Sequence, residues 1–138
     1  QCNVALPRAP LDAPVMAGFV KAVDDVNWLA DKSSGFLWRL LPQHGHVTFG
    51  QLEGDEVIVT LSVWMDFEAL QRYVYRTAHG LFMGQRRRWF VPIGGLTTAM
   101  WWVPDGERPA LDDGFCFAGP LAKRRLAGRA FFLCAAGK

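Results

Sequence analysis

The sequence predicts an α+β fold, an antiparallel sheet with helices on one face, and three observations lead to this class. Residues 56–65, EVIVTLSVWM, have the β-branched and apolar character of a strand. Residues 12–31 carry apolar side chains at helical spacing. The order strand, helix, strand occurs in both halves of the chain. Because 138 residues suffice for one core and not for two, residues 1–138 are expected to form a single domain.

In the first half, Val4–Leu6 is expected to be a short strand. The helix of residues 12–31 begins at a capping aspartate and carries Pro14 in its first turn, where the missing N–H costs nothing. Phe36–Leu41 is predicted to be the second strand, and the polar, glycine-rich residues 43–55 are predicted to be a long hairpin loop with some irregular pairing before the strand at 56–65. Alternation along the second strand places Phe36, Trp38 and Leu40 on one face, and Leu37, Arg39 and Leu41 on the other.

In the second half, residues 66–90 predict a helix that Gly80 and Gly84 weaken, so that two shorter helices with a joint near His79 are the alternative. The run Leu96–Val103 predicts a fourth strand. Gly119 and Pro120 exclude one continuous helix over residues 111–126, and Gly128–Cys134 predicts the last strand. The resulting order, β-α-β-β-α-β, is that of a ferredoxin-like fold.

One sheet face of such a fold packs on the helices, and the other is expected to carry some of the large residues Trp38, Trp64, Trp101 and Trp102. Soluble monomers rarely expose so much contiguous apolar surface. The sequence therefore predicts a homodimer in which two sheets pack face to face.

Composition argues against several classes of function. A formal charge of +2 is too small to favour a nucleic-acid partner. The three cysteines lack CxxC spacing, which argues against a zinc site or a disulfide framework and favours a reducing, cytoplasmic location. No apolar run approaches the ~20 residues of a membrane span. His44 and His46 have no third ligand nearby, so no metal site is expected.

Three blocks in order resemble an uncharacterised family of small bacterial and fungal proteins in the dimeric α/β-barrel superfamily: NVALPRAPLDAPVMAGFVKAVDDVNWLADKSSGFLWRL, LSVWMDFEALQRYVYRTAHGLFMGQRRRWF and WWVPDGERP. That superfamily also holds antibiotic-biosynthesis monooxygenases, haem-degrading monooxygenases and chlorite-dismutase-like haem proteins. An asparagine near the start of the family pattern is matched by Asn3, and its Tyr-Arg-x-x-His block falls on Tyr75, Arg76 and His79. The C-terminal third departs from the pattern, because Gly114, Gly119 and Pro120 interrupt its usual helix. Further matches are Asn27, Ala30, Asp31, Gly35, Phe36, Trp38, Arg39, Ser62, Trp64, Trp89 and Phe90.

The residues themselves suggest a pocket around His79. Tyr75 and His79 are four apart, so both are expected on one face of the predicted helix. An imidazole with a pKa near neutrality suits general acid–base catalysis or haem ligation, whereas the structural alternative has His79 bonded to a backbone carbonyl. Arg39 either pairs with Asp31 or Glu68, or anchors an acidic group of a ligand. The expected substrate-binding residues are Trp38, Trp64, Phe36, Trp102 and Phe82.

The resemblance implies a small cofactor-independent enzyme that acts on an apolar or aromatic molecule in an internal barrel pocket. The reaction would be monooxygenase-like, or a cyclisation or isomerisation in secondary metabolism. His79 would be the base, Asn3 or Arg39 the oxyanion donor, and Tyr75 part of the wall. Two alternatives stay open: a haem-binding protein with His79 as axial ligand, and a non-catalytic dimer that binds small molecules.

Overall fold

The structure is a computed structural model that describes residues 1–42, 45–77, 79–93, 97–113 and 130–131. It is a mixed α+β fold in which every strand pairing is antiparallel. The strands are β1 Cys2–Pro7, β2 Phe36–Arg39, β3 Thr48–Leu52, β4 Asp55–Trp64, β5 Phe90–Val91, β6 Thr98–Trp101 and β7 Ala130–Phe131. The helices are η1 Pro14–Met16, α1 Ala17–Asp31, α2 Phe67–Arg76, α3 His79–Gly84 and α4 Arg86–Trp89.

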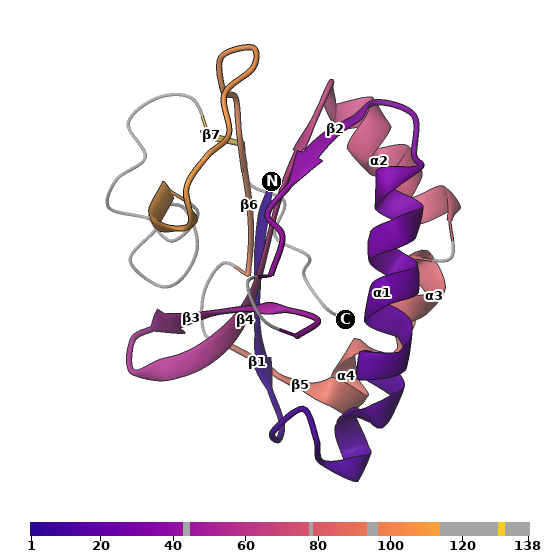
Figure 1. Cartoon of the computed structure of the whole chain (residues 1–138), viewed down its shortest axis with the longest axis vertical. Coiled ribbons are helices and arrows are strands. Elements are labelled where there is room, and N and C mark those ends of the chain that lie inside the picture. Colours follow the sequence, from indigo (N-terminus) through magenta and orange to yellow (C-terminus); the bar gives the residue numbers. More distant parts are fainter. Residues whose placement is uncertain (43–44, 78, 94–96, 114–129, 132–138) are drawn as a thin grey trace.

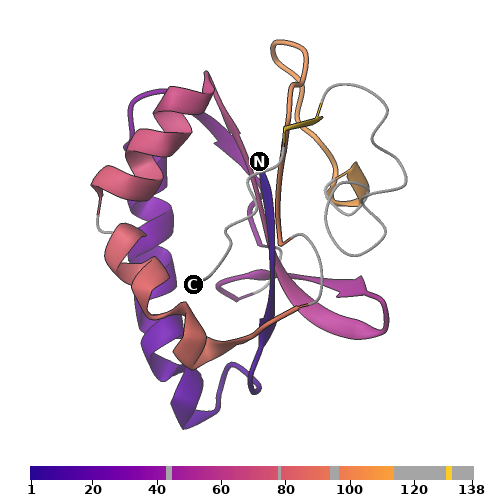
Figure 2. The same cartoon turned by 180° about the vertical axis from the view of Figure 1, so that it is seen from behind.

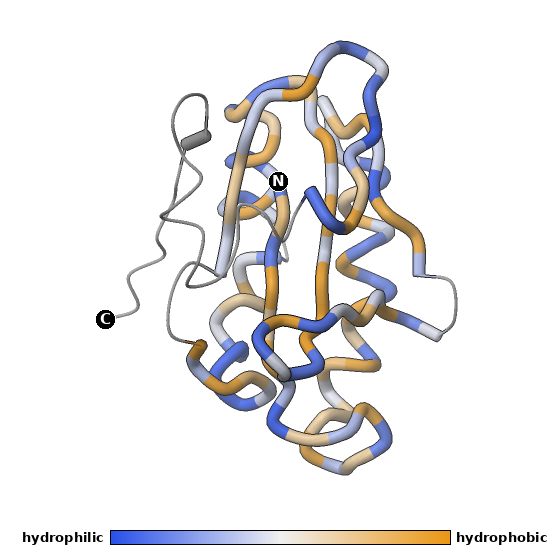
Figure 3. The backbone as a smooth tube through the Cα atoms, turned by 90° about the vertical axis from the view of Figure 1, so that its left-hand side faces the viewer, coloured by the Kyte–Doolittle hydropathy of each residue, from blue (hydrophilic) through white to orange (hydrophobic). Residues whose placement is uncertain are grey.

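The strands follow the spatial order β2-β4-β1-β6-β7, while β3 also pairs with β4 and β5 with β1. β1 lies in the middle, because Cys2 is opposite Leu61 of β4 on one side and Ala99 of β6 on the other. Helices η1 and α1 to α4 lie on one side of this sheet, and residues 102–113, with a short helical stretch at 111–113, lie on the other (Figures 1 and 2). Hydrophobic and hydrophilic residues are interspersed along most elements, as expected for elements with one buried side (Figure 3).

The core is divided by the sheet. On the helix side, Ile58 of β4 belongs to a cluster with Met16 and Phe19, and Trp64 packs against a second cluster that includes Leu70 and Tyr73. The opposite face holds a separate cluster, which consists of Cys2, Val4, Val57, Val59 and Leu61, with Trp38, Trp101 and Leu111 packed against it. The space between helices and sheet is therefore bounded by the even-numbered residues of β4.

The predicted first helix is largely confirmed. Residues 14–16 form a 3-10 turn and α1 follows from Ala17 to Asp31, with Pro14 in the first turn as expected. Burial of Phe19, Val23 and Ala30 agrees with the helical spacing of the apolar residues.

The pairing expected within the hairpin loop at residues 43–55 is present, but in the second part of the segment it is regular and not irregular. Residues 48–52 form β3, which pairs along β4 from Thr48↔Val59 to Leu52↔Asp55. Glu53 and Gly54 make the two-residue turn between these strands, with φ of 53° and 92°. A turn of this kind needs positive φ at both positions and matches the twist of the two strands, which explains why so polar a segment still pairs.

Residues 66–90, which were expected to form one helix or two shorter ones, form three helices. Asp66 caps α2 as a strong capping residue should, because its Oδ1 accepts from the Ala69 N–H at 2.7 Å. Thr77 leaves the helical conformation with φ −122° and ψ 178°, so α3 starts afresh at His79. α4 ends at Trp89, and Phe90 begins β5.

The remaining expectations concern the last third of the chain. Of the predicted strand Leu96–Val103, residues 98–101 form β6, and Leu96 lies outside the described residues. Residues 111–113 are helical, and the rest of the expected helical turns up to residue 126 lie outside the described residues. Of the predicted strand Gly128–Cys134 only Ala130–Phe131 is described, and it is a strand. Among the described helices, none has the length and apolar character to cross a membrane.

Candidate functional site

The imidazole of His79 lies between the helices and the sheet, in a half-buried position. The backbone break at Thr77 directs it there, and the Thr77 hydroxyl oxygen accepts from the His79 N–H at 3.2 Å. The imidazole centroid is 4.8 Å from the ring of Tyr73 and 6.3 Å from that of Phe82. His79 therefore forms part of an aromatic wall built by α2 and α3.

The Nδ1 atom of His79 is buried and has no hydrogen-bond partner among the described residues. Burial lowers the pKa of the imidazole below its ordinary value, and a hydrogen bond with the Val74 backbone, which was the structural alternative expected for His79, opposes this only in part. The imidazole is therefore neutral at physiological pH. A buried polar atom without a partner is rare in folded proteins, and a ligand or a water molecule is its usual explanation.

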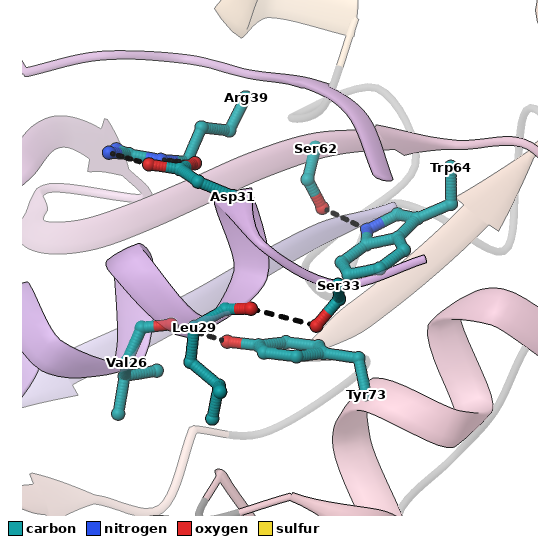
Figure 4. A network of polar contacts seen from close by, with 8 residues as sticks. All are labelled: Val26, Leu29, Asp31, Ser33, Arg39, Ser62, Trp64 and Tyr73. Carbon is teal, nitrogen blue, oxygen red and sulfur yellow. Dashed lines mark hydrogen bonds and ion pairs between the residues drawn. The ribbon is translucent and has the colours of Figure 1, made fainter. Parts of the chain in front are cut away.

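Tyr73 is the centre of the aromatic wall, and the sequence interpretation missed it. Its ring stacks on the indole of Trp64 at 5.0 Å, and its hydroxyl group donates to the Val26 carbonyl at 3.1 Å (Figure 4). Burial raises the pKa of this phenol well above its ordinary value, so it stays protonated. The residues buried on α2 are Ala69, Leu70 and Tyr73. Tyr73 follows them at the spacing of three and four residues that marks one helix face, and this is the signal by which it could have been found.

The sheet surface opposite the aromatic wall is polar. Ser62 and Trp64 share a hydrogen bond from the indole Nε1 to the hydroxyl Oγ at 2.9 Å (Figure 4). On the neighbouring strands, the Thr98 hydroxyl donates to the Asn3 side-chain oxygen at 2.8 Å. Asn3 is opposite Thr60 of β4, which is solvent-exposed although its strand is central. Because Thr60 is on the same sheet face as Ile58 and Ser62, solvent reaches this sheet surface on the helix side.

Arg39 closes one end of this polar surface. Its guanidinium donates two hydrogen bonds to the Asp31 carboxylate, from Nε at 2.7 Å and from Nη2 at 3.2 Å (Figure 4). The expected ion pair with Asp31 is thus confirmed, and it ties β2 to the end of α1. Arg39 is opposite Ser62 in the strand register, so both belong to the same sheet face.

The structure brings most of the expected site residues to the helix side of the sheet. Phe36 lies edge-on to Trp64 at 5.3 Å, and Phe82 contacts the wall beside His79. Asn3 and Arg39 lie on the sheet face that is turned to this wall.

Three expected site residues are elsewhere. Tyr75 is 70% exposed on the outside of α2, since the break at Thr77 takes His79 off the helix face that the two residues were expected to share. Trp38 packs on the opposite sheet face, because a register shift between Phe36 and Trp38 reverses the expected alternation. Trp102 is 62% exposed beyond the end of β6.

The metal prediction concerned two histidines on either side of Gly45. His44 lies outside the described residues, and His46 is bonded to Asp24 through Nδ1 at 2.8 Å. Among the described residues, no group of three histidine, cysteine or acidic side chains is placed to hold a metal ion.

Comparison with known proteins gives one match. The family model described as "Domain of unknown function (DUF3291)" matches residues 1–131. No curated protein and no solved structure matches the chain.

Proposed function

We propose that this chain, which belongs to the DUF3291 family, is an enzyme for a small aromatic or apolar molecule bound between its helices and its sheet. The observation that carries the proposal is the neutral imidazole of His79, whose buried Nδ1 has no partner among the described residues. A neutral imidazole nitrogen accepts a proton or a hydrogen bond, and a ligand at this position would satisfy it.

The proposed chemistry begins with transfer of a proton from the substrate to His79. The stacked pair of Trp64 and Tyr73 would offer its exposed ring edges to a flat aromatic substrate. The Asn3 amide or the Arg39 guanidinium on the facing sheet surface would stabilise the resulting oxyanion. An electron-rich anion of this kind can react directly with O₂, or can cyclise or isomerise, and no bound cofactor is needed.

The fold supports the same proposal. The strand order β2-β4-β1-β6, with α1 and α2 on one face, agrees with a ferredoxin-like arrangement. Together with the resemblance of the sequence blocks, this supports membership of the dimeric α/β-barrel superfamily and a homodimeric assembly. Fold alone does not determine the reaction, so the chemistry rests on His79 and its surroundings.

Haem binding through His79 fits the surroundings less well. The Tyr73 and Phe82 rings stand beside the imidazole, and a macrocycle, which is far larger than the substrate proposed above, would have to displace these rings. Titration with haemin checks this: a sharp Soret band that His79→Gln abolishes would favour the haem alternative over the proposal.

The proposal is tested with an anthrone, a tricyclic aromatic ketone whose ring methylene loses a proton readily. Its oxidation consumes one O₂ and yields the anthraquinone and one water, so oxygen uptake and absorbance both report the reaction. With chelator present, the protein should accelerate uptake, and His79→Gln should slow it by about 10²–10⁴-fold, the usual contribution of a general base.

His46→Gln is the matched control, because it makes the same exchange at an exposed histidine bonded to Asp24. It should leave the rate unchanged. Equal rates for the folded His79→Gln variant and the unmodified protein would exclude His79 as the base, whereas failure of all enolisable aromatic ketones to react would reject the proposed reaction class.

A further inference from the structure

A second surface feature lies on the outside of the helical layer. Two adjoining depressions of about 430 and 460 Å³ meet at Tyr75, and we call them together the outer groove. α2 contributes one end of the groove, while α3 and α4 contribute the other. The groove lies outside the helices, whereas His79 faces the sheet, so it is separate from the site of the proposed reaction.

The outer groove has a strong excess of positive charge. Arg72, Arg76 and Arg86 line it, and none of them makes an ion pair within the described part of the chain. Glu68 is the only acidic residue of the lining. Arg72 and Arg76 are one helical turn apart, a spacing at which like charges destabilise a helix. The end of α2 favours a cation at Arg76, but this does not account for Arg72 or Arg86.

An aromatic ring stands at the centre of these cations. Tyr75 is 70% exposed, lines both depressions, and so offers a free ring face. Beside it, Gly84 has open space where a side chain would begin, which leaves room for a ligand close to the backbone. Val74 and Met83 make this end of the groove partly apolar.

We propose that the outer groove binds a small molecule in which a phosphate group is joined to an aromatic ring. Guanidinium groups bind phosphate oxygens with two parallel hydrogen bonds each, and two arginines one turn apart can reach the same phosphate. The ring of the ligand stacks on Tyr75, and arginine planes can cover its other face. This site is independent of the reaction proposed for His79.

The test uses phenyl phosphate as the probe, titrated into isotopically labelled protein while backbone amide shifts are recorded at low ionic strength. Saturable shifts are expected at groove residues. Arg76→Glu should weaken binding at least about tenfold, which corresponds to 1.4 kcal/mol. Tyr75→Ala should lower the affinity for phenyl phosphate to that for inorganic phosphate, because the ring contribution is then lost. Benzoate, which has the ring with a carboxylate, should bind more weakly than phenyl phosphate.

Arg108→Glu is the matched control, since it makes the same change of charge at an exposed arginine in the segment on the other side of the sheet. It should change the affinity less than about twofold, well below the tenfold step that one strong contact contributes. An equal loss of affinity in Arg76→Glu and Arg108→Glu would show that net charge alone attracts phenyl phosphate, and it would overturn the proposal. Shifts that do not saturate, or that lie away from the groove, would overturn it as well.

Discussion

At the scale of single residues, His79 should make folding stability depend on pH. Its pKa in the folded state is lowered by burial, whereas an unfolded histidine titrates near about 6.5. Below that pH the unfolded chain binds a proton that the folded chain does not, so the free energy of unfolding falls as the pH falls. Above about pH 7.5 both states are neutral and this contribution no longer changes.

Urea unfolding of the unmodified protein and of His79→Gln, at several pH values from neutral to mildly acidic, checks this dependence. The unmodified protein should lose more stability on acidification than the variant does. Parallel losses in the two proteins would show that the imidazole is not buried as neutral histidine. The proton signals of the imidazole, followed by NMR, give its pKa directly.

Tyr73 allows the phenol hydroxyl and the ring to be separated. Tyr73→Phe removes only the hydrogen bond to the Val26 carbonyl and should cost about 0.5–1.5 kcal/mol of unfolding free energy. Tyr73→Ala also removes the ring that packs on Trp64 and His79, and should cost about 3–5 kcal/mol. Chemical denaturation measures both. A cost for the phenylalanine variant as large as that for the alanine variant would contradict the stacked arrangement.

Single residues of the site were only partly predictable from the sequence. His79, Trp64, Phe36 and Phe82 were expected in a pocket, because aromatic and imidazole side chains on regular elements favour one. Tyr75 was expected there as well, since helical spacing alone joins it to His79. A joint near His79 was expected from Gly80, but the direction in which the break at Thr77 turns the imidazole depends on a backbone conformation that residue spacing does not encode.

At the scale of elements, Gly35 holds the start of β2 close to α2. Its φ is +84°, and a side chain at this position would collide with the Cβ of Ala69. Gly35→Ala should therefore cost about 1–2 kcal/mol for the backbone conformation and about 1–3 kcal/mol more for overpacking. The expected result is a clear loss of unfolding free energy, measured by denaturation.

Gly54→Ala is the matched control, because Gly54 has φ of +92° and open space around it. At Gly54 only the cost of the backbone conformation should lower the free energy of unfolding. Equal losses at the two glycines would show that α2 and β2 do not approach as closely as the structure has them.

Elements with a strong local signal were predictable, and those set by tertiary contacts were not. The helix of residues 12–31 and the strand at 56–65 followed from periodicity, and the antiparallel α+β class followed from their order. β3 was missed because a short polar strand is stabilised by its partner β4 and not by its own pattern. The register shift in β2 likewise depends on its pairing with β4.

At the scale of the whole molecule, the two sheet faces differ from what the sequence suggested. The face away from the helices was expected to be bare and apolar, yet Val57, Val59 and Leu61 are at most 2% exposed within one chain. Ile93 and Leu111 are among the residues that pack there. A second copy is therefore not needed to cover that cluster, and the proposed homodimer has to use other apolar residues.

The outer edge of β2 offers such residues. β2 is the last strand on its side of the order β2-β4-β1-β6-β7, and Leu37 within it is 58% exposed while Leu41, two residues beyond its end, is 63% exposed. Unpaired strand edges with exposed apolar residues are prone to pair with another chain.

We therefore expect light scattering to give about twice the 15.4 kDa of one chain, and Leu37→Glu to shift the mass towards the monomer. Leu81→Glu, the same change at a 77% exposed leucine of α3, should leave the dimer intact. A monomeric mass for the unmodified protein at high concentration would refute the dimer, and equal dissociation by both variants would place the interface away from β2.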